Sequence, residues 1–172
     1  MSDFSIAAVV HHDDGDEAAA ALWAAARDLQ AQGCRVAGLL NPLDENGRHI
    51  RSQLVSVADG SRYPIFQNLG SGSSGCKLDS RLLAAAATVL QRAVDDEADV
   101  LFINKFGHVE IENHGLNDEY LAAAAAGIPV LTAVHRKYLA DWQRFCGGEG
   151  VELPADAQAV SAWAQTLIGV QP

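Results

Sequence analysis

The sequence has few of the features that mark nucleic-acid-binding, secreted or membrane proteins. Its 12 Lys and Arg against 22 Asp and Glu give a formal net charge of -10, so it lacks the basic surface that displaces counterions from a phosphate backbone. Its three cysteines (Cys34, Cys76 and Cys146) form neither a disulfide framework nor a zinc-type pair. No apolar run approaches the ~20 residues of a membrane span, and residues 1–5 show no signal-peptide pattern. We therefore expect a cytoplasmic protein that binds neither nucleic acid nor membrane.

The composition is that of an ordinary globular protein. The chain has 172 residues, of which 49% are hydrophobic and 20% charged, and this length suffices to bury one full-sized core. Many of the apolar residues are alanines, which favours closely packed helices. No repeat and no shift in composition divides the chain. Residues 1–172 are therefore predicted to form a single domain.

Short apolar runs typical of buried strands alternate with longer segments of helical periodicity. Strands are predicted at 5–10, 35–40, 100–103 and 129–134, and helices at 16–32, 79–95, 116–126, 139–145 and 155–168. The first strand–helix–strand unit implies parallel pairing. The pattern predicts a doubly wound α/β fold with a mostly parallel sheet and ligands at the carboxyl ends of its strands. Residues 53–57 and 63–67, around Asp59-Gly60-Ser61, predict an inserted β-hairpin.

A segment rich in glycine and serine joins this hairpin to the next helix. Successive backbone N–H groups in such a turn can converge on one oxyanion, hydroxyls add donors, and Lys77 adds a positive charge. The helix expected from Asp79 would direct its N-terminal dipole to the same place. The composition fits a flexible linker as well. The candidate oxyanion ligands here are Ser71, Gly72, Ser73, Ser74, Gly75, Cys76 and Lys77.

The turn after the first strand lacks the lysine of a nucleotide-binding P-loop. That motif, G-x-x-x-x-G-K-[ST], would stand between the first strand and the first helix, but residues 10–18 read Val-His-His-Asp-Asp-Gly-Asp-Glu-Ala. The carboxylates would repel a triphosphate; they either hold a hard cation or complement the start of the helix. His11 and His12 are accessory candidates, for a metal or for an oxyanion when protonated. Since neighbouring strand residues point to opposite faces, one of the two faces away from any site.

The loop after the third predicted parallel strand supplies the remaining candidates. Asn104 and Lys105 follow that strand directly, where ligands bind in doubly wound folds. His108, three residues further on, is another accessory candidate. A solvated surface loop is the alternative interpretation. If this loop meets the glycine- and serine-rich turn, Lys77 and Lys105 form an electropositive pocket within an acidic molecule.

These segments resemble an uncharacterised bacterial domain family. The resemblance rests on Leu69-Gly-x-Gly-Ser-x-Gly-Cys-x-Leu-Asp79, on Asn104-Lys-Phe-Gly107 with Glu110, and on Gly127-Ile-Pro-Val-Leu-Thr-Ala-Val134. It covers nearly the whole chain. The family is often encoded beside molybdate-transport or nitrogenase genes and is similar to small P-loop nucleoside triphosphatases, which implies their fold.

In those triphosphatases an Asp-Glu pair, which serves the metal and the attacking water, stands in the place of Asn104 and Lys105. The lysine and hydroxyl of the P-loop are also absent here. Each change removes a part that phosphoryl transfer needs. The resemblance therefore implies a P-loop-like fold with a degenerate phosphate loop and without nucleotide hydrolysis.

Three functions follow from these observations. The leading hypothesis is a non-catalytic protein that binds molybdate or tungstate for storage, delivery or sensing. The second is a divergent nucleotide-binding or triphosphatase-like enzyme. The third is a protein-interaction module on a dead nucleotide-binding scaffold, which would expose an apolar patch around Tyr138, Trp142 and Phe145. Whether the chain forms a homo-oligomer and whether it holds a metal stay open.

Overall fold

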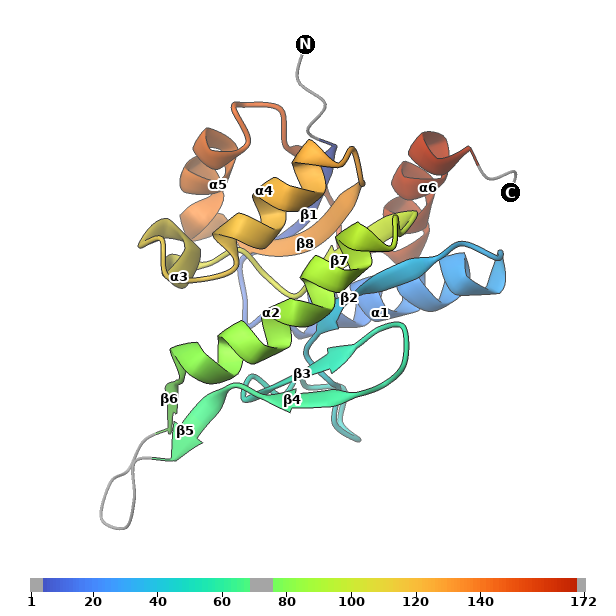
Figure 1. Ribbon diagram of the computed structural model, residues 1–172. Coiled ribbons are helices and arrows are strands. Elements are labelled where there is room, and N and C mark those ends of the chain that lie inside the picture. Colours follow the sequence, from blue (N-terminus) through green and yellow to red (C-terminus); the bar gives the residue numbers. More distant parts are fainter. Residues whose placement is uncertain (1–4, 69–75, 170–172) are drawn as a thin grey trace.

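A seven-stranded sheet with helices on both faces forms the body of the protein. The computed structural model describes residues 5–68 and 76–169. The strands lie in the order β4-β3-β2-β7-β8-β1-β9 (Figure 1). Their bounds are β1 Ile6–His11, β2 Val36–Leu40, β3 Gln53–Ser56, β4 Arg62–Pro64, β7 Val100–Ile103, β8 Val130–His135 and β9 Val151–Leu153. A separate antiparallel pair consists of β5 (Phe66–Asn68) and β6 (Cys76–Leu78).

The helices connect these strands in the order that the sequence predicts. They are α1 Asp16–Ala31, α2 Ser80–Asp95, α3 His108–Ile111, α4 Asn117–Ala125, α5 Leu139–Phe145 and α6 Ala157–Ile168, with a 3-10 turn, η1, at Arg136–Tyr138. Asp79 caps α2 as expected, because its carboxylate accepts the backbone N–H groups of Arg81 (2.8 Å) and Leu82 (3.3 Å).

Five of the seven strands are parallel. β2, β7, β8, β1 and β9 run in one direction, while β3 and β4 form an antiparallel hairpin that pairs with β2, the outermost of the parallel strands on that side. The mostly parallel α/β sheet with an inserted hairpin is thus confirmed. The expected pairing of the first two strands is wrong, because β7 and β8 lie between β2 and β1. The connection through α1 therefore spans two strands of the sheet.

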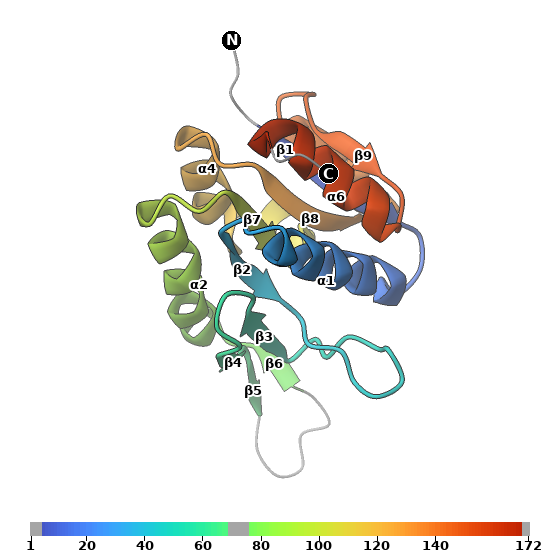
Figure 2. The same ribbon diagram turned by 90° about the vertical axis from the view of Figure 1, so that its right-hand side faces the viewer.

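Helices cover both faces of the sheet, so each central strand is buried on both sides. α1 and α6 lie on one face, and α2 and α4 lie on the other (Figure 2). Successive side chains of β1 pack alternately into the core layers on the two faces of the sheet. Ala7 and Val9 pack toward α1, whereas Ile6 and Ala8 pack toward α4 and α5. This explains why the strands read as continuous apolar runs rather than as alternating patterns.

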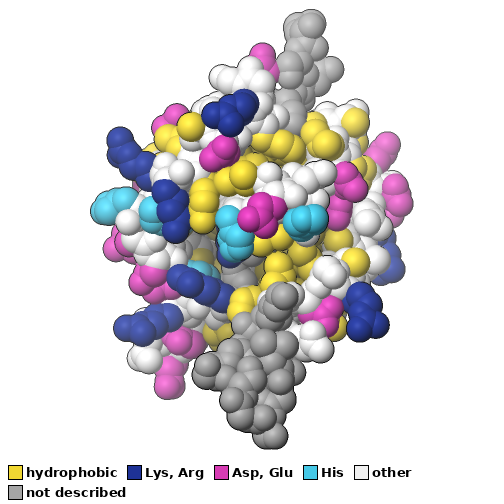
Figure 3. All heavy atoms as spheres, turned by 90° about the vertical axis from the view of Figure 1, so that its left-hand side faces the viewer, with side chains coloured by type: hydrophobic (Ala, Val, Ile, Leu, Met, Phe, Trp, Pro, Cys, Tyr) yellow, Lys and Arg dark blue, Asp and Glu magenta, His cyan; other side chains and the backbone are white. Residues whose placement is uncertain are grey.

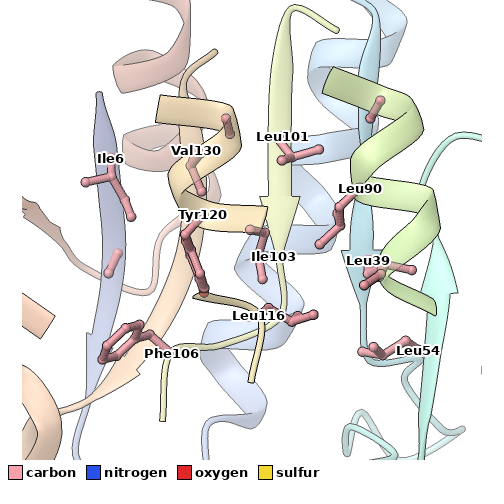
Figure 4. Packing of buried hydrophobic residues seen from close by; sticks show 14 of the residues in the cluster. Ile6, Leu39, Leu54, Leu90, Leu101, Ile103, Phe106, Leu116, Tyr120 and Val130 are labelled. Atoms are coloured by element: carbon pink, nitrogen blue, oxygen red, sulfur yellow. The ribbon is translucent and has the colours of Figure 1, made fainter. Parts of the chain in front are cut away.

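The layer beneath α2 and α4 runs to the carboxyl end of the sheet. Ile103 on β7 packs among side chains of both helices, and Leu54 and Leu116 lie at the end of this layer where the strands finish (Figure 4). β2 and β7 approach closely at Gly38, where a Cβ atom would lie 2.1 Å from the carbonyl oxygen of Phe102. Only glycine fits this point of contact.

Four short elements differ from the sequence prediction. The predicted strand at 63–67 is divided into β4 and β5 around the buried Ile65. β6 and β9, of three residues each, were not predicted, because so short a run carries no readable period. The expected irregular loop at 104–115 contains α3.

The apolar patch that the interaction-module hypothesis requires is not exposed. Trp142 is completely buried, and Tyr138 and Phe145 are half-buried against the same core. Close packing at Trp142 extends to Gly150, where a Cβ atom would lie 2.5 Å from the indole ring. Within the described part of the chain, no helix combines the length and apolarity needed to cross a bilayer.

Candidate functional site at the carboxyl edge of the sheet

The carboxyl ends of four parallel strands surround one cavity of about 330 Å³. It is lined by His11 at the end of β1, Asn41 after β2, Asn104 after β7 and His135 at the end of β8. Ligands of doubly wound folds bind outside this edge of the sheet. The fold therefore gathers side chains from distant parts of the sequence at the place where a binding site is expected.

Cationic and titratable side chains dominate the polar lining of this cavity. Figure 3 views the molecule from this edge and shows His, Lys and Arg side chains around a hollow. The basic side chains in the lining are Arg51, Lys105, Lys137, His11, His49, His108 and His135, and the carboxylates are those of Asp13 and Asp14. Arg51, Lys105 and Lys137 outnumber the two carboxylates, so a chain of formal net charge -10 has a local excess of positive charge here, and such an excess attracts anions.

The carboxylates of the first turn are engaged with backbone close by. Asp13 accepts the N–H of Gly15 (3.0 Å) and Asp14 accepts the N–H of Asp16 (3.1 Å). The bond from Gly15 is the main reason that the pKa of Asp13 lies below its usual value. Gly15 itself has φ of 90°, a left-handed conformation that glycine adopts readily. The lowered pKa keeps Asp13 ionised, and its negative charge at the start of α1 would repel a phosphate there.

Asp16 stands directly after Gly15, the place that lysine takes in a P-loop. Its carboxylate accepts the backbone N–H of His49 (3.0 Å) and pairs with the His49 ring. The backbone bond is the first cause that lowers the pKa of Asp16. Asp16 therefore fastens the loop after β2 to α1 and takes no phosphate-binding role.

The two adjacent histidines at the end of β1 have different surroundings. His12 is exposed and does not line the cavity. His11 lies against His135 in an edge-to-face contact, with ring centroids 5.3 Å apart, and desolvation lowers its pKa. Its Nδ1 is 3.5 Å from a carboxylate oxygen of Asp13 and makes no hydrogen bond. Of the two candidates, only His11 faces the cavity.

Two hydrogen bonds fix the backbone around Lys105, and a third holds the Tyr120 hydroxyl that makes one of them. The N–H of Phe106 donates to the carbonyl of Ala133 (2.9 Å), and the Tyr120 hydroxyl lies 2.9 Å from the Lys105 carbonyl and 2.8 Å from Thr132 Oγ1. The Lys105 side chain lines the cavity and retains exposed surface. Desolvation by the surrounding protein lowers its pKa, Arg51 adds to the effect, and Glu110 opposes it.

Glu110 is a buried carboxylate that organises the same loop. It is 6% exposed, and its two oxygens accept the N–H groups of Gly107 (2.7 Å) and Leu116 (3.1 Å). Burial raises its pKa, while these hydrogen bonds and the charge of Lys105 act in the opposite direction. At Gly115 a Cβ atom would lie 1.8 Å from a carboxylate oxygen of Glu110, so the loop closes over this carboxylate only because residue 115 is glycine.

Asn104 is held by the loop that follows β2. Its Nδ2 donates to the Asn41 side-chain oxygen (3.2 Å), and Asn41 Nδ2 donates to the carbonyls of Ile50 (3.2 Å) and Gln53 (2.9 Å). Asn104 therefore links two edges of the cavity. The predicted candidates Asn104, Lys105, His11 and His108 line one cavity.

The predicted glycine and serine ligands, Ser71, Gly72, Ser73, Ser74 and Gly75, fall outside the described residues. Cys76 and Lys77 are on β6, where they pair in register with Asn68 and Gln67 of β5. The next residue, Leu78, lines a second cavity together with Asn104 and Lys105. β6 therefore ends beside the Lys105 loop, and a meeting of Lys77 with Lys105 remains a prediction.

Sequence reasoning missed several lining residues. Asn41 and His135 could have been found by marking the residue at the end of every parallel strand. His49 and Arg51 had no such signal, since they come from a loop whose path depends on the Asp16–His49 contact. Glu110 looks like one more charge on a polar loop until its burial is known. Among residues 5–68 and 76–169, no three His, Cys, Asp or Glu side chains group as metal ligands.

Comparisons with known proteins agree with this fold. The chain is 40% identical over 140 residues to molybdenum import ATP-binding protein ModC 2 of Bradyrhizobium diazoefficiens, covering 80% of this chain and 16% of that protein. It is 30% identical over 114 residues to nucleoside-triphosphatase THEP1 of Methanopyrus kandleri, covering 63% of this chain and 62% of that one. The chain thus spans less than two thirds of either relative.

Two solved structures share the fold at low sequence identity. A human cancer-related nucleoside triphosphatase has a TM-score of 0.62 at 15% identity and covers 96% of each chain. THEP1 from Aquifex aeolicus has a TM-score of 0.62 at 10% identity and covers 97% of this chain and 99% of its own. The sheet is therefore that of the P-loop nucleoside triphosphatases, and the match of residues 6–163 shows that the chain belongs to the family described as "Protein of unknown function (DUF2478)".

Proposed function

We propose that this chain binds an oxyanion, without hydrolysing nucleotides, in the cavity at the carboxyl edge of the sheet. The observation that carries the proposal is the placement of Lys105 and Arg51 in the cavity lining, in a molecule that is otherwise strongly acidic. Molybdate and tungstate are the candidate ligands. Both are dianions that need only hydrogen-bond donors and positive charge, which lysine and arginine supply.

The same residues argue against phosphoryl transfer. The lysine of a P-loop is replaced by Asp16, whose carboxylate is engaged with His49. The acidic pair that would serve magnesium and water is replaced by Asn104 and Lys105. Phosphoryl transfer requires stabilisation of charge on the γ-phosphate and a positioned water. Asp16 brings no positive charge to the first loop, and neither Asn104 nor Lys105 offers the carboxylate that would position the water.

The choice of molybdate and tungstate over other oxyanions draws on one relative. The Bradyrhizobium diazoefficiens protein that contains a similar segment is named for molybdenum import. Only about a sixth of that protein matches, so its name describes much more than the shared segment. A role in storage, delivery or sensing of the oxyanion would suit a segment of this kind.

Calorimetric titration of the protein with molybdate, tungstate, sulfate and phosphate tests this proposal. We expect heat with at least one of the four, and affinity at least about 10-fold lower in Lys105→Ala, because a charge-assisted hydrogen bond contributes about 1.5–3 kcal/mol. Arg27→Ala is the matched control. It removes an equal charge from α1, where Arg27 stacks on Trp23 outside the cavity lining. Absence of heat with all four anions would remove the proposal.

Nucleotide binding or hydrolysis is the second candidate, favoured by the similarity to two triphosphatases and to an ATP-binding protein. Release of phosphate from ATP and GTP with magnesium separates it from the first. Hydrolysis by the wild-type chain that disappears in Lys105→Ala would establish the enzyme. Hydrolysis that persists unchanged in that variant would point to a contaminating activity. If the wild-type chain hydrolyses neither nucleotide, the oxyanion proposal is the one left to test.

A further inference from the structure

A second, more apolar chamber opens directly beside the cationic cavity. Its volume is about 660 Å³, and β3, β5, β6, α2 and α3 contribute to its wall. The apolar part of the lining includes Leu54, Phe66, Leu78, Leu83, Val109 and Leu116. Leu54 and Leu116 belong to the buried core layer at the end of the strands (Figure 4), so this wall is held in place by the fold.

The chamber and the cationic cavity share one wall. Asn41, His49, Arg51, Asn104, Lys105 and His108 line both. Lys105 and Arg51 therefore stand between a polar compartment and an apolar one. Glu110 also lines the chamber, and each of its two carboxylate oxygens accepts a backbone N–H group of the same loop.

This juxtaposition selects a kind of ligand. An inorganic oxyanion would occupy only the cationic compartment and leave the leucine-lined wall in contact with water. A ligand with an anionic group and an apolar ring would use both compartments, and it would gain the free energy of removing apolar surface from water. Ligand pockets of this type combine an apolar wall with a few fixed polar groups.

We propose that the site also takes an organic anion, and more tightly than a free oxyanion: the oxyanion group of this ligand lies at Lys105 and Arg51, and its ring-sized apolar part lies in the chamber between α2, α3 and β3. This inference rests on the proposed oxyanion site and specifies what carries the oxyanion. A nucleotide belongs to this chemical class, and so does any phosphorylated aromatic or heterocyclic compound.

Titration with inorganic phosphate and with phenyl phosphate tests the inference, because both present the same anionic group and only one carries a ring. We expect phenyl phosphate to bind at least about 10-fold more tightly than inorganic phosphate, which is the ratio of affinities expected when one face of the phenyl ring is removed from water. Val109→Trp, which fills the chamber from α3, should abolish this preference and leave phosphate binding unchanged, since Val109 lines only the chamber.

Ser80→Trp is the second filling variant, because Ser80 is exposed at the start of α2 and lines the chamber. Ala84→Trp, exposed on the same helix outside the chamber lining, is the matched control and should keep the preference. Equal affinities for the two probes in the wild-type chain, or a preference that survives both filling variants, would overturn the inference while the oxyanion site stands. Failure of both probes to bind, while molybdate or tungstate binds, would overturn this inference alone, and failure of all these anions would overturn both proposals.

Discussion

The loop after β1 and the loop after β7 lie on the same edge of the sheet and present side chains of opposite charge to the cavity, Asp13 and Asp14 from the first and Lys105 from the second. The first has its carboxylates bound to backbone N–H groups of its own turn and of residue 49. The second presents Lys105 to the cavity and buries Glu110 beneath its own backbone. In a P-loop enzyme the lysine belongs to the first loop and the carboxylates to the second. The two loops of this chain therefore place their cavity-facing charges the opposite way round from those of a P-loop enzyme.

The largest effect on stability is expected at Gly115, where the loop after β7 packs directly against the Glu110 carboxylate. In Gly115→Ala the new Cβ would meet the Glu110 carboxylate, and displacing it would break two backbone hydrogen bonds. We expect the free energy of unfolding to fall by about 3 kcal/mol, the upper range for overpacking, measured by urea denaturation. Gly107→Ala is the control, because its Cβ would have no neighbour closer than 4.0 Å. Equal losses in the two variants would show that the carboxylate does not organise the loop.

Glu110→Gln probes the same carboxylate without a change of shape. An amide can accept only one of the two N–H groups well, so we expect a loss of about 1–2 kcal/mol. Because burial raises the pKa of Glu110 above 4.5, the folded wild type holds its proton more tightly than the unfolded chain. The stability difference between wild type and variant should therefore shrink as pH rises from 4.5 through the raised pKa. A difference that grows over that range would contradict the assigned direction.

Lys105→Arg tests the charge of the second loop, given the proposed oxyanion site. Desolvation lowers the pKa of Lys105 below 10.5, so wild-type affinity for molybdate should fall as pH rises, before 10.5 is reached. Arginine stays protonated throughout. We expect the wild-type affinity to decline toward the alkaline end and the variant profile to stay flat, measured by titration between pH 7 and 10. Parallel profiles would assign the binding charge to another residue.

The smallest effect is expected from the two histidines of the first loop. His12→Ala removes an exposed side chain and should change stability by less than about 0.5 kcal/mol. His11→Ala removes a ring contact with His135, which contributes about 1 kcal/mol. Thermal unfolding of the pair would show the difference as a lower Tm for His11→Ala. The reverse order would mean that the strand end presents the opposite face to the cavity.

The sequence was sufficient to predict the parallel sheet because the central strands of this sheet are buried on both faces. Val100 to Ile103 are all fully buried, and such a strand appears in the sequence as an uninterrupted apolar run. The pairing of β1 could not be predicted in this way, since no local pattern states that β8 and β9, rather than β2, become its neighbours. Pairing order is decided by the packing of distant helices.

The candidate site was predictable only in part, for a related reason. Residues that directly follow a strand, such as Lys105, are placed by the strand itself. Arg51 reaches the cavity through a loop fixed by a long-range contact, and Glu110 is defined by burial that only the folded loop creates. A charge in a polar stretch gives no sign of whether it will be solvated or enclosed.

The side chain of Asn41 makes three segments dependent on one another. It is 7% exposed, and its amide joins the ends of two strands to the base of the hairpin. A ligand that drew Asn104 toward itself would break its bond to Asn41 Oδ1 and leave the Asn41 side chain bonded only to the carbonyls of Ile50 and Gln53. Exchange of the backbone amides near β3 would then report occupancy of the cavity without any label on the ligand.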